Sequence, residues 1–143
     1  MKTISSKTAI VTGAGHPKGI GRAICRQLAL AGVNIAALDL TAAVGLDTVV
    51  QDLESLGVKA CSIECDVTSP MSVSNAVEQV RRSLGPVDLL VNNAGIAAGV
   101  SDFLEIREDD WTASLAVNLL GTVNMCSAII PSMLKQDLSL IHI

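Results

Sequence analysis

The residues best placed to do chemistry are four glycines that follow a short apolar run, residues 9–11, near the start of the chain. Gly13 would let the chain turn sharply as it leaves a strand, and Gly15 or Gly19 would remove a side chain where an anion approaches the backbone. Gly21 would let the next helix lie close to that strand. The free N–H groups of the first helical turn then face the anion, which predicts a phosphate-binding turn. A plain strand-to-helix turn without a ligand is the alternative.

A second candidate is the carboxylate of Asp39, which ends the apolar run 33–38 and lies 18 residues after Gly21. An acidic side chain at this place accepts hydrogen bonds from the ribose hydroxyls of a dinucleotide. It also repels a 2′-phosphate, so it favours NAD over NADP. Lys18 acts in the opposite direction, because a cation in the glycine turn attracts that phosphate, but its effect is less direct. Asp39 could instead cap a helix, and His16 could contact a phosphate but is expected to face solvent.

The rest of the pattern predicts the elements that position these residues, because apolar strand-like runs alternate with segments of helical spacing. The predicted strands are residues 8–12, 33–38, 58–65 and 87–91. The predicted helices are 19–30, 42–56, 70–84 and a long helix that begins at Asp109 or Asp110 and continues through Ile130. Thr41 and Ser69 are expected to cap the second and third helices. This alternation predicts right-handed crossovers onto one parallel sheet, an α/β fold of the Rossmann-type doubly wound class. No repeat or linker divides the chain, so we expect one domain or a piece of one.

Composition argues against several classes of function. The formal net charge is −4 and the Lys and Arg residues are scattered, whereas a nucleic-acid footprint needs clustered basic residues. With one Phe, one Trp and no Tyr, the chain also lacks a platform on which bases could stack. The apolar run after Lys7 is too short for a signal peptide, which favours a cytoplasmic protein. Cys25, Cys61, Cys65 and Cys126 lack the spacing of a zinc site, so we expect no metal and reduced thiols that pack as small apolar groups.

Residues 111–134 contain no charged residue, which raises the question of a membrane span. Asn118 and Asn124 lie within this segment, and Gly121 and Pro131 interrupt it. Membrane spans rarely carry several amides. We therefore predict a long helix outside the membrane, buried on most sides by the chain's own core and by a partner subunit.

Four motifs complete the pattern: Thr12-Gly13 with Gly19-Ile20-Gly21, then Asp66-Val67, Asn92-Asn93-Ala94-Gly95 and Asn118. Their order and spacing over residues 5–136 resemble those of the short-chain dehydrogenase/reductase family. The resemblance implies that the first motif binds the cofactor, the second contacts adenine and the third lines the cofactor cleft. It implies that Asn118 is a catalytic residue, which holds a water in the proton relay. The predicted cofactor-binding residues are Gly13, Gly15, Gly19, Ile20, Gly21, Asp39, Asp66, Val67, Asn92, Asn93, Ala94 and Gly95.

The resemblance also implies an activity and an assembly. Members of this family interconvert an alcohol and a ketone by hydride transfer with NAD or NADP. For this chain, NAD is the favoured cofactor because of Asp39, and a small-molecule alcohol or ketone is the expected substrate. The charge-free helix resembles the family's dimer-forming helix, so a homodimer or homotetramer is expected for the intact protein.

Two departures from the family pattern shape this expectation. Five residues separate Thr12-Gly13 from Gly19, where the family usually has three. The chain also contains no tyrosine, so the Tyr-x-x-x-Lys that supplies the family's general acid and base is absent. Residues 137–143 do not resemble the family's continuation, and we interpret them as a tail of unrelated sequence.

The resulting hypothesis is an incomplete NAD(P)-binding Rossmann domain over residues 1–143, family-like over 1–136. Its truncated sheet would have the strand order 3-2-1-4, and the strand 87–91 would be an exposed edge. The chain would be the N-terminal part of an NAD(P)-dependent short-chain oxidoreductase and inactive alone. The alternatives are a non-catalytic nucleotide-binding module and an inactive fragment.

Overall fold

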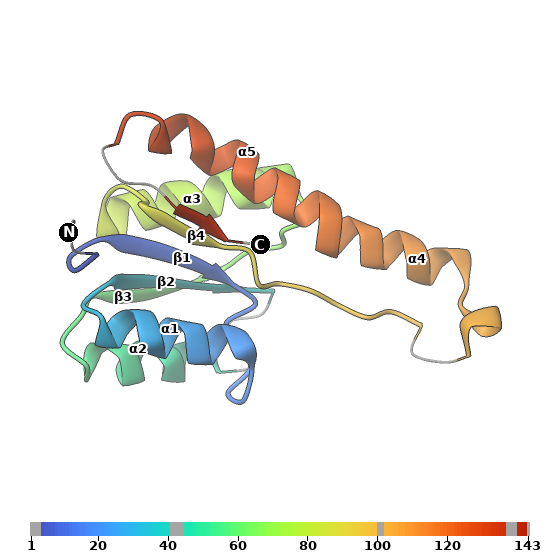
Figure 1. The fold of residues 1–143 in the computed structure, drawn as a ribbon, viewed down its shortest axis with the longest axis horizontal. Helices are drawn as coiled ribbons and strands as arrows, with labels where there is room; N and C mark the ends of the chain where they lie inside the picture. Colours follow the sequence, from blue (N-terminus) through green and yellow to red (C-terminus); the bar gives the residue numbers. More distant parts are fainter. Residues whose placement is uncertain (1–3, 41–44, 100–101, 137–139, 143) are drawn as a thin grey trace.

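In a computed structural model, a parallel β-sheet lies between two layers of helices (Figure 1). The structure describes residues 4–40, 45–99, 102–136 and 140–142. The strands lie in the order β3-β2-β1-β4-β5, and every neighbouring pair is parallel. The strand bounds are Thr8–Thr12 (β1), Asn34–Asp39 (β2), Ala60–Glu64 (β3), Leu89–Val91 (β4) and Leu140–His142 (β5).

The helices divide between the two faces of the sheet (Figure 1). Their bounds are Ile20–Leu30 (α1), Leu46–Glu54 (α2), Pro70–Leu84 (α3), Glu108–Leu115 (α4) and Thr122–Met133 (α5). Successive residues of a strand point to opposite faces, so Val11 packs in the core under α1 and α2 while Ile10 packs in the core under α3 and α5. Because both faces are covered, all five residues of β1 are buried.

Several elements lie where the sequence predicts them. Strand β1 spans Thr8–Thr12 as expected, and helix α1 begins one residue later than expected, at Ile20. Ser69 caps α3 as predicted, since its hydroxyl accepts a hydrogen bond from the amide of Ser72 at 3.3 Å. The predicted cap Thr41 lies outside the described residues, and the N-cap of α2 is Gly45, with φ at +116°.

The predicted exposed edge at β4 is wrong, because a fifth strand covers it. Strand β5 pairs with β4 in the register Leu89 with Leu140 and Val91 with His142. The side chain of Gln136 donates a hydrogen bond to the carbonyl of Val87 at 2.9 Å, so the chain after α5 returns beside the start of β4. Residues 140–142 therefore extend the order 3-2-1-4 by one strand, and 137–139 and 143 lie outside the described residues.

The chain's own core covers less of the long helix than predicted, and burial by a partner subunit stays a prediction. Helices α4 and α5 are joined by the π-helical segment Ala116–Gly121 into one helical run, which extends beyond the sheet (Figure 1). Only its α5 part packs on α3, and Leu119 is 56% exposed. In the part of the chain that the structure describes, this run of 26 residues contains a window of 18 residues with a mean hydropathy of 1.6, of which 17% is buried, and so it meets the length and composition of a membrane span. That test is weak evidence for a membrane, because it rests on length and composition alone.

Candidate functional site

The glycine turn between β1 and α1 brings two segments of backbone close together. Gly13 adopts φ +67°, and a Cβ there would lie 2.9 Å from the Cα of Ala94. A Cβ on Gly21 would overlap the carbonyl oxygen of Gly13 and lie 2.6 Å from the side-chain nitrogen of Asn93. Both positions therefore require glycine, which explains how α1 approaches the end of β4 so closely.

The first turn of α1 offers backbone donors that the helix itself does not use. Gly19 is the N-cap, and the first bond within the helix runs from the amide of Ala23 to the carbonyl of Gly19 at 3.2 Å. The amides of residues 20–22 consequently have no carbonyl one turn earlier in the helix. Together with the positive end of the helix dipole, they make this end of α1 the kind of site that binds anions, as the sequence predicts.

Asp39 lies at the carboxyl end of β2 and faces the glycine turn. Its Oδ2 accepts a hydrogen bond from the amide of Gly15, and its Oδ1 accepts one from the amide of Leu40, each at 2.7 Å. The carboxylate therefore does not cap α2, whose N-cap is Gly45. A Cβ on Gly15 would lie 2.9 Å from Oδ2 of Asp39, so this glycine allows the close contact.

The end of β4 is tied to the glycine turn through Thr12 and Asn93. The Thr12 hydroxyl accepts hydrogen bonds from the amides of Asn93 and Ala94, both at 3.0 Å. The Asn93 side chain donates to the carbonyls of Thr12 at 2.9 Å and Gly13 at 3.1 Å. Thr12 is buried, so these bonds form in a region of low solvent access and fix the separation of β1 and β4. By contrast, Asn92 points toward α5 and donates to the sulfur of Cys126 at 3.6 Å.

Asn118 lies in the π-helical segment and holds the chain that follows β4. Its Oδ1 accepts a hydrogen bond from the amide of Ile96, and its Nδ2 donates to the carbonyl of the same residue, each at 2.9 Å. A π-helical turn inside an α-helix is rare and frequently marks a functional site. The predicted catalytic asparagine therefore contacts the cavity wall through Ile96.

Asp66 and Val67 directly follow the end of β3 and also line the cavity. The Asp66 carboxylate accepts hydrogen bonds from the amide and hydroxyl of Thr68, at 2.9 and 2.7 Å. The carbonyl of Val67 accepts one from the side chain of Asn124 at 2.9 Å, and a Cβ on Gly121 would lie 2.7 Å from a methyl of Val67. Helix α5 thus fixes the position of Val67.

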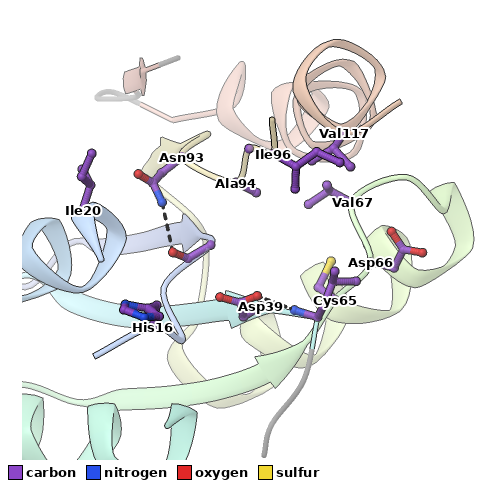
Figure 2. A pocket seen from close by; sticks show the side chains of 13 residues that line it. His16, Ile20, Asp39, Cys65, Asp66, Val67, Asn93, Ala94, Ile96 and Val117 are labelled. Carbon is purple, nitrogen blue, oxygen red and sulfur yellow. Dashed lines mark hydrogen bonds between the residues drawn. The ribbon is translucent and has the colours of Figure 1, made fainter. Parts of the chain in front are cut away.

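These segments enclose one cavity of about 360 Å³ at the carboxyl ends of β1, β2 and β4. It is lined by Gly13, His16, Ile20, Asp39, Leu40, Cys65, Asp66, Val67, Asn93, Ala94, Gly95, Ile96 and Val117. Figure 2 shows His16 and Asp39 on one side of the cavity and Val67, Ile96 and Val117 gathered on the other. This edge of the sheet, where the chain order reverses between β1 and β4, is where open α/β sheets bind ligands.

The cavity brings together most, but not all, of the predicted site residues. Five predicted site residues do not line the cavity: Gly15, Gly19, Gly21, Asn92 and Asn118. The residues that sequence reasoning missed are Leu40, Cys65, Ile96 and Val117, which are apolar or nearly so and carry no motif signal. Asn124 was also missed, although an amide in an uncharged helical segment is itself a signal, because it needs a hydrogen-bond partner.

The wall near Asp66 includes a thiol. Burial raises the pKa of Cys65 to about 11, with a smaller opposing contribution from a hydrogen bond with Ser72. The thiol is therefore protonated at neutral pH and a poor nucleophile there. No group of three or more His, Cys, Asp and Glu side chains that could hold a metal occurs among the described residues.

Known proteins share this arrangement. The family model for short chain dehydrogenases matches residues 7–141. Oxidoreductase UcpA of Salmonella typhimurium is 32% identical over 136 residues, which cover 95% of this chain and 50% of that protein. D-threitol dehydrogenase of Mycolicibacterium smegmatis is 38% identical over 132 residues, which cover 92% and 49%.

A solved structure, that of NAD⁺-bound xylitol dehydrogenase, superposes with a TM-score of 0.89 at 34% identity. The match covers 98% of this chain and 53% of that one, so the chain spans about half the length of the relatives it matches. The glycine turn at the start of α1, the parallel sheet and the match to the family model lead to one assignment. This chain belongs to the short-chain dehydrogenase family.

Proposed function

We propose that this chain forms the N-terminal, NAD-binding half of an oxidoreductase. One observation carries the proposal: a single cavity joins the amino end of α1, the Asp39 carboxylate and the segment that follows β4. These are a helix end that suits an anion, a hydrogen-bond acceptor for a diol and a backbone segment with the small residues Ala94 and Gly95. Their combination in one cavity suits a dinucleotide better than it suits a simple anion.

The residues present fit the parts of NAD. The free amides of residues 20–22 would bind the pyrophosphate, and Gly13, which lines the same cavity, adds no side chain there. Asp39 would accept hydrogen bonds from the adenosine ribose, since each carboxylate oxygen has a lone pair beyond the bond it now accepts. Asp66 and Val67 would border the adenine. The negative charge of Asp39 would disfavour the 2′-phosphate of NADP.

In the intact protein we propose interconversion of an alcohol and a ketone. NAD supplies a nicotinamide ring that accepts a hydride from the alcohol carbon. The two similar dehydrogenases are named for the sugar alcohols threitol and xylitol, which supports a small alcohol as substrate. The role of this chain would be to hold the cofactor. Asn118 would keep the segment at Ile96 in place beside the cofactor.

The exposed side of α4 and α5 supports an assembly. Five apolar side chains on one helical run are each about half exposed: Trp111, Leu115, Leu119, Leu120 and Val123. An apolar surface of this kind suits contact with a second copy, so we propose a homodimer or homotetramer for the intact protein. We also propose a cytoplasmic location, which fits four free cysteines.

A second candidate function is a nucleotide-binding module without catalysis. The chain contains no tyrosine, so the 143-residue protein lacks the group that the family resemblance implies as general acid and base. The two candidates differ in turnover and agree on NAD binding. We therefore expect the isolated chain to bind NAD and to oxidise no alcohol.

Thermal unfolding with and without NAD tests the proposal. For a dissociation constant near 100 µM, 1 mM NAD would stabilise the chain by about 1.4 kcal/mol, a rise in Tm of about 3 to 6 °C. Asp39→Ala should remove the shift, whereas the matched acidic control Glu54→Ala, on the exposed side of α2, should retain it. No shift in the wild-type chain at millimolar NAD would refute the proposed function.

A further inference from the structure

His16 stands at the tip of the glycine turn and lines the cavity (Figure 2). It is one of the five residues between Gly13 and Gly19, a turn two residues longer than is usual in the family. We infer that His16 contacts the cofactor, donating a hydrogen bond from Nε2 to an oxygen of the pyrophosphate. The inference rests on the proposed function. None of the motifs gives His16 a role in cofactor binding, so the inference adds a residue to the site.

The hydrogen bonds of the turn fix which nitrogen carries the proton. Nδ1 of His16 accepts a hydrogen bond from the amide of Lys18 at 3.2 Å. A ring nitrogen that accepts carries no hydrogen, so the neutral ring has its N–H at Nε2. Among the residues that the structure describes, Nε2 has no partner, which leaves one donor available at the cavity wall.

The position of His16 points to a phosphate rather than to the ribose. Its carbonyl accepts a hydrogen bond from the amide of Gly19, the N-cap of α1, at 2.9 Å. A Cβ on Gly19 would lie 3.3 Å from the Cβ of His16, so the imidazole begins beside the amino end of the helix. Both oxygens of Asp39, by contrast, already accept backbone hydrogen bonds, and neither is bonded to His16. The free donor therefore lies beside the amino end of α1, where the pyrophosphate would bind.

The turn that carries His16 packs against the amino end of α2. A Cβ on Gly45 would lie 3.0 Å from the carbonyl oxygen of Gly15 and 3.4 Å from the ring of Pro17. Arg22 donates a hydrogen bond to the carbonyl of Gly45 at 3.0 Å and forms an ion pair with Asp52 at 2.7 Å. The amino end of α2 thus packs against the lengthened turn, and Pro17 limits its backbone freedom. A donor held in this way loses little entropy when the ligand binds.

Two amide substitutions separate the contact with the cofactor from the support of the turn. In His16→Asn the amide oxygen replaces Nδ1, so the bond from the Lys18 amide is kept and the donor to the cavity is lost. In His16→Gln the longer amide replaces Nε2, so the donor is kept and the turn bond is lost. His16→Phe removes both. Circular dichroism would confirm that each variant folds, as expected for an exposed turn.

Isothermal titration with NAD, ADP and adenosine provides the test. We expect His16→Asn and His16→Phe to weaken NAD and ADP binding about 10-fold, as for a hydrogen bond to a charged group, and His16→Gln to stay within about threefold of wild type. Adenosine, which has no phosphate, should bind all four proteins alike.

Each other outcome has a defined meaning. If wild type binds NAD and His16→Asn binds it equally well, the inference is wrong and the proposed function stands. The inference is also wrong, and the proposed function stands, if His16→Gln loses as much affinity as His16→Asn, because loss of the hydrogen bond within the turn would then explain the effect. A parallel fall in adenosine binding would lead to the same conclusion. If wild type binds neither NAD nor ADP, both the proposed function and this inference fail.

Discussion

The backbone amide of Gly15 donates a hydrogen bond to Oδ2 of Asp39 at 2.7 Å, which joins the glycine turn after β1 to the end of β2. These two segments come from different strand–helix units, and each alone is a common local structure. Their contact places a carboxylate beside the anion-binding end of α1. The cofactor preference that we propose depends on this pair, because the carboxylate that positions the turn also carries the charge that would face the ribose.

Replacing the charge of Asp39 while keeping its shape should change cofactor preference. In Asp39→Asn the amide oxygen can still accept the Gly15 hydrogen bond, but the repulsion of a 2′-phosphate is lost. We expect the ratio of NADP to NAD dissociation constants to fall about 10-fold in titration calorimetry. The matched variant Glu64→Gln, at the end of the neighbouring strand β3, should leave the ratio unchanged. Equal ratios in wild type and Asp39→Asn would show that this carboxylate does not set the preference.

Adding a methyl group at Gly21 should destabilise the fold, because a Cβ there overlaps the Gly13 carbonyl and lies 2.6 Å from the Asn93 side chain. We expect Gly21→Ala to lower the free energy of unfolding by about 1 to 3 kcal/mol in urea denaturation. Gly19→Ala is the control, because its Cβ would meet its nearest neighbour at 3.1 Å and should cost about 1 kcal/mol or less. A smaller loss for Gly21→Ala than for Gly19→Ala would contradict the packing described for this turn.

Removing the hydroxyl of Thr12 should lower the free energy of unfolding by more than the loss of one small group from the core would. Thr12→Val keeps the volume but leaves the amides of Asn93 and Ala94 without their acceptor in a buried position. We expect a loss of about 1 to 3 kcal/mol in unfolding free energy. Thr12→Ser, which restores the hydroxyl and removes only a methyl group, should recover most of it. Equal losses in both variants would mean that packing, not hydrogen bonding, is what Thr12 provides.

The buried thiols predict a loss of stability at alkaline pH. Burial raises the pKa of Cys25 from 9.0 to about 12, with a smaller opposing effect of Arg22. As the pH rises above about 9, the unfolded chain releases this proton while the folded chain keeps it. The free energy of unfolding should therefore fall between about pH 9 and 12, by up to about 1.4 kcal/mol per pH unit for this thiol, and be unaffected by it near neutral pH.

Urea denaturation from pH 7 to 10.5 checks this slope. Cys61 and Cys65, with pKa values raised to about 11 by burial, contribute in the same direction. Cys25→Ala should make the slope shallower, whereas Val33→Ala, a cavity in the same core without a titrating group, should lower stability equally at each pH. Parallel curves for wild type and Cys25→Ala would rule out the assigned cause.

Local signals in the sequence were sufficient for much of the fold and for part of the site. The apolar run at β1, the Ser69-Pro70 start of α3 and the carboxylate that ends β2 each have a short-range physical cause that the sequence shows directly. The glycine spacing likewise predicted a turn that the structure places at the start of α1. These features depend on neighbours within a few residues, so no knowledge of the tertiary structure was needed.

Features that depend on distant contacts were not predictable in this way. The three-residue strand β5 gains its stability from pairing with β4, which a run as short as Leu140-Ile141-His142 does not reveal. The helical run over α4 and α5 is apolar, and its sequence could not show that the chain's own core covers so little of it. The sequence predicts that His16 faces solvent, and the residue is exposed. It also lines the cavity because of the path of the lengthened turn, which the sequence does not show.

The most direct test of the central claim is an NMR titration of the ¹⁵N-labelled chain with NAD, followed through its backbone amide signals. We expect saturable shifts concentrated at Gly13, Asp39, Val67 and Ala94, which line the cavity, and little change at Glu78 and Arg82 on the exposed side of α3. Asp39→Ala should abolish the shifts at the same NAD concentration. An unchanged spectrum at millimolar NAD, or shifts that spread over α3 and spare the glycine turn, would contradict the claim that this cavity binds the dinucleotide.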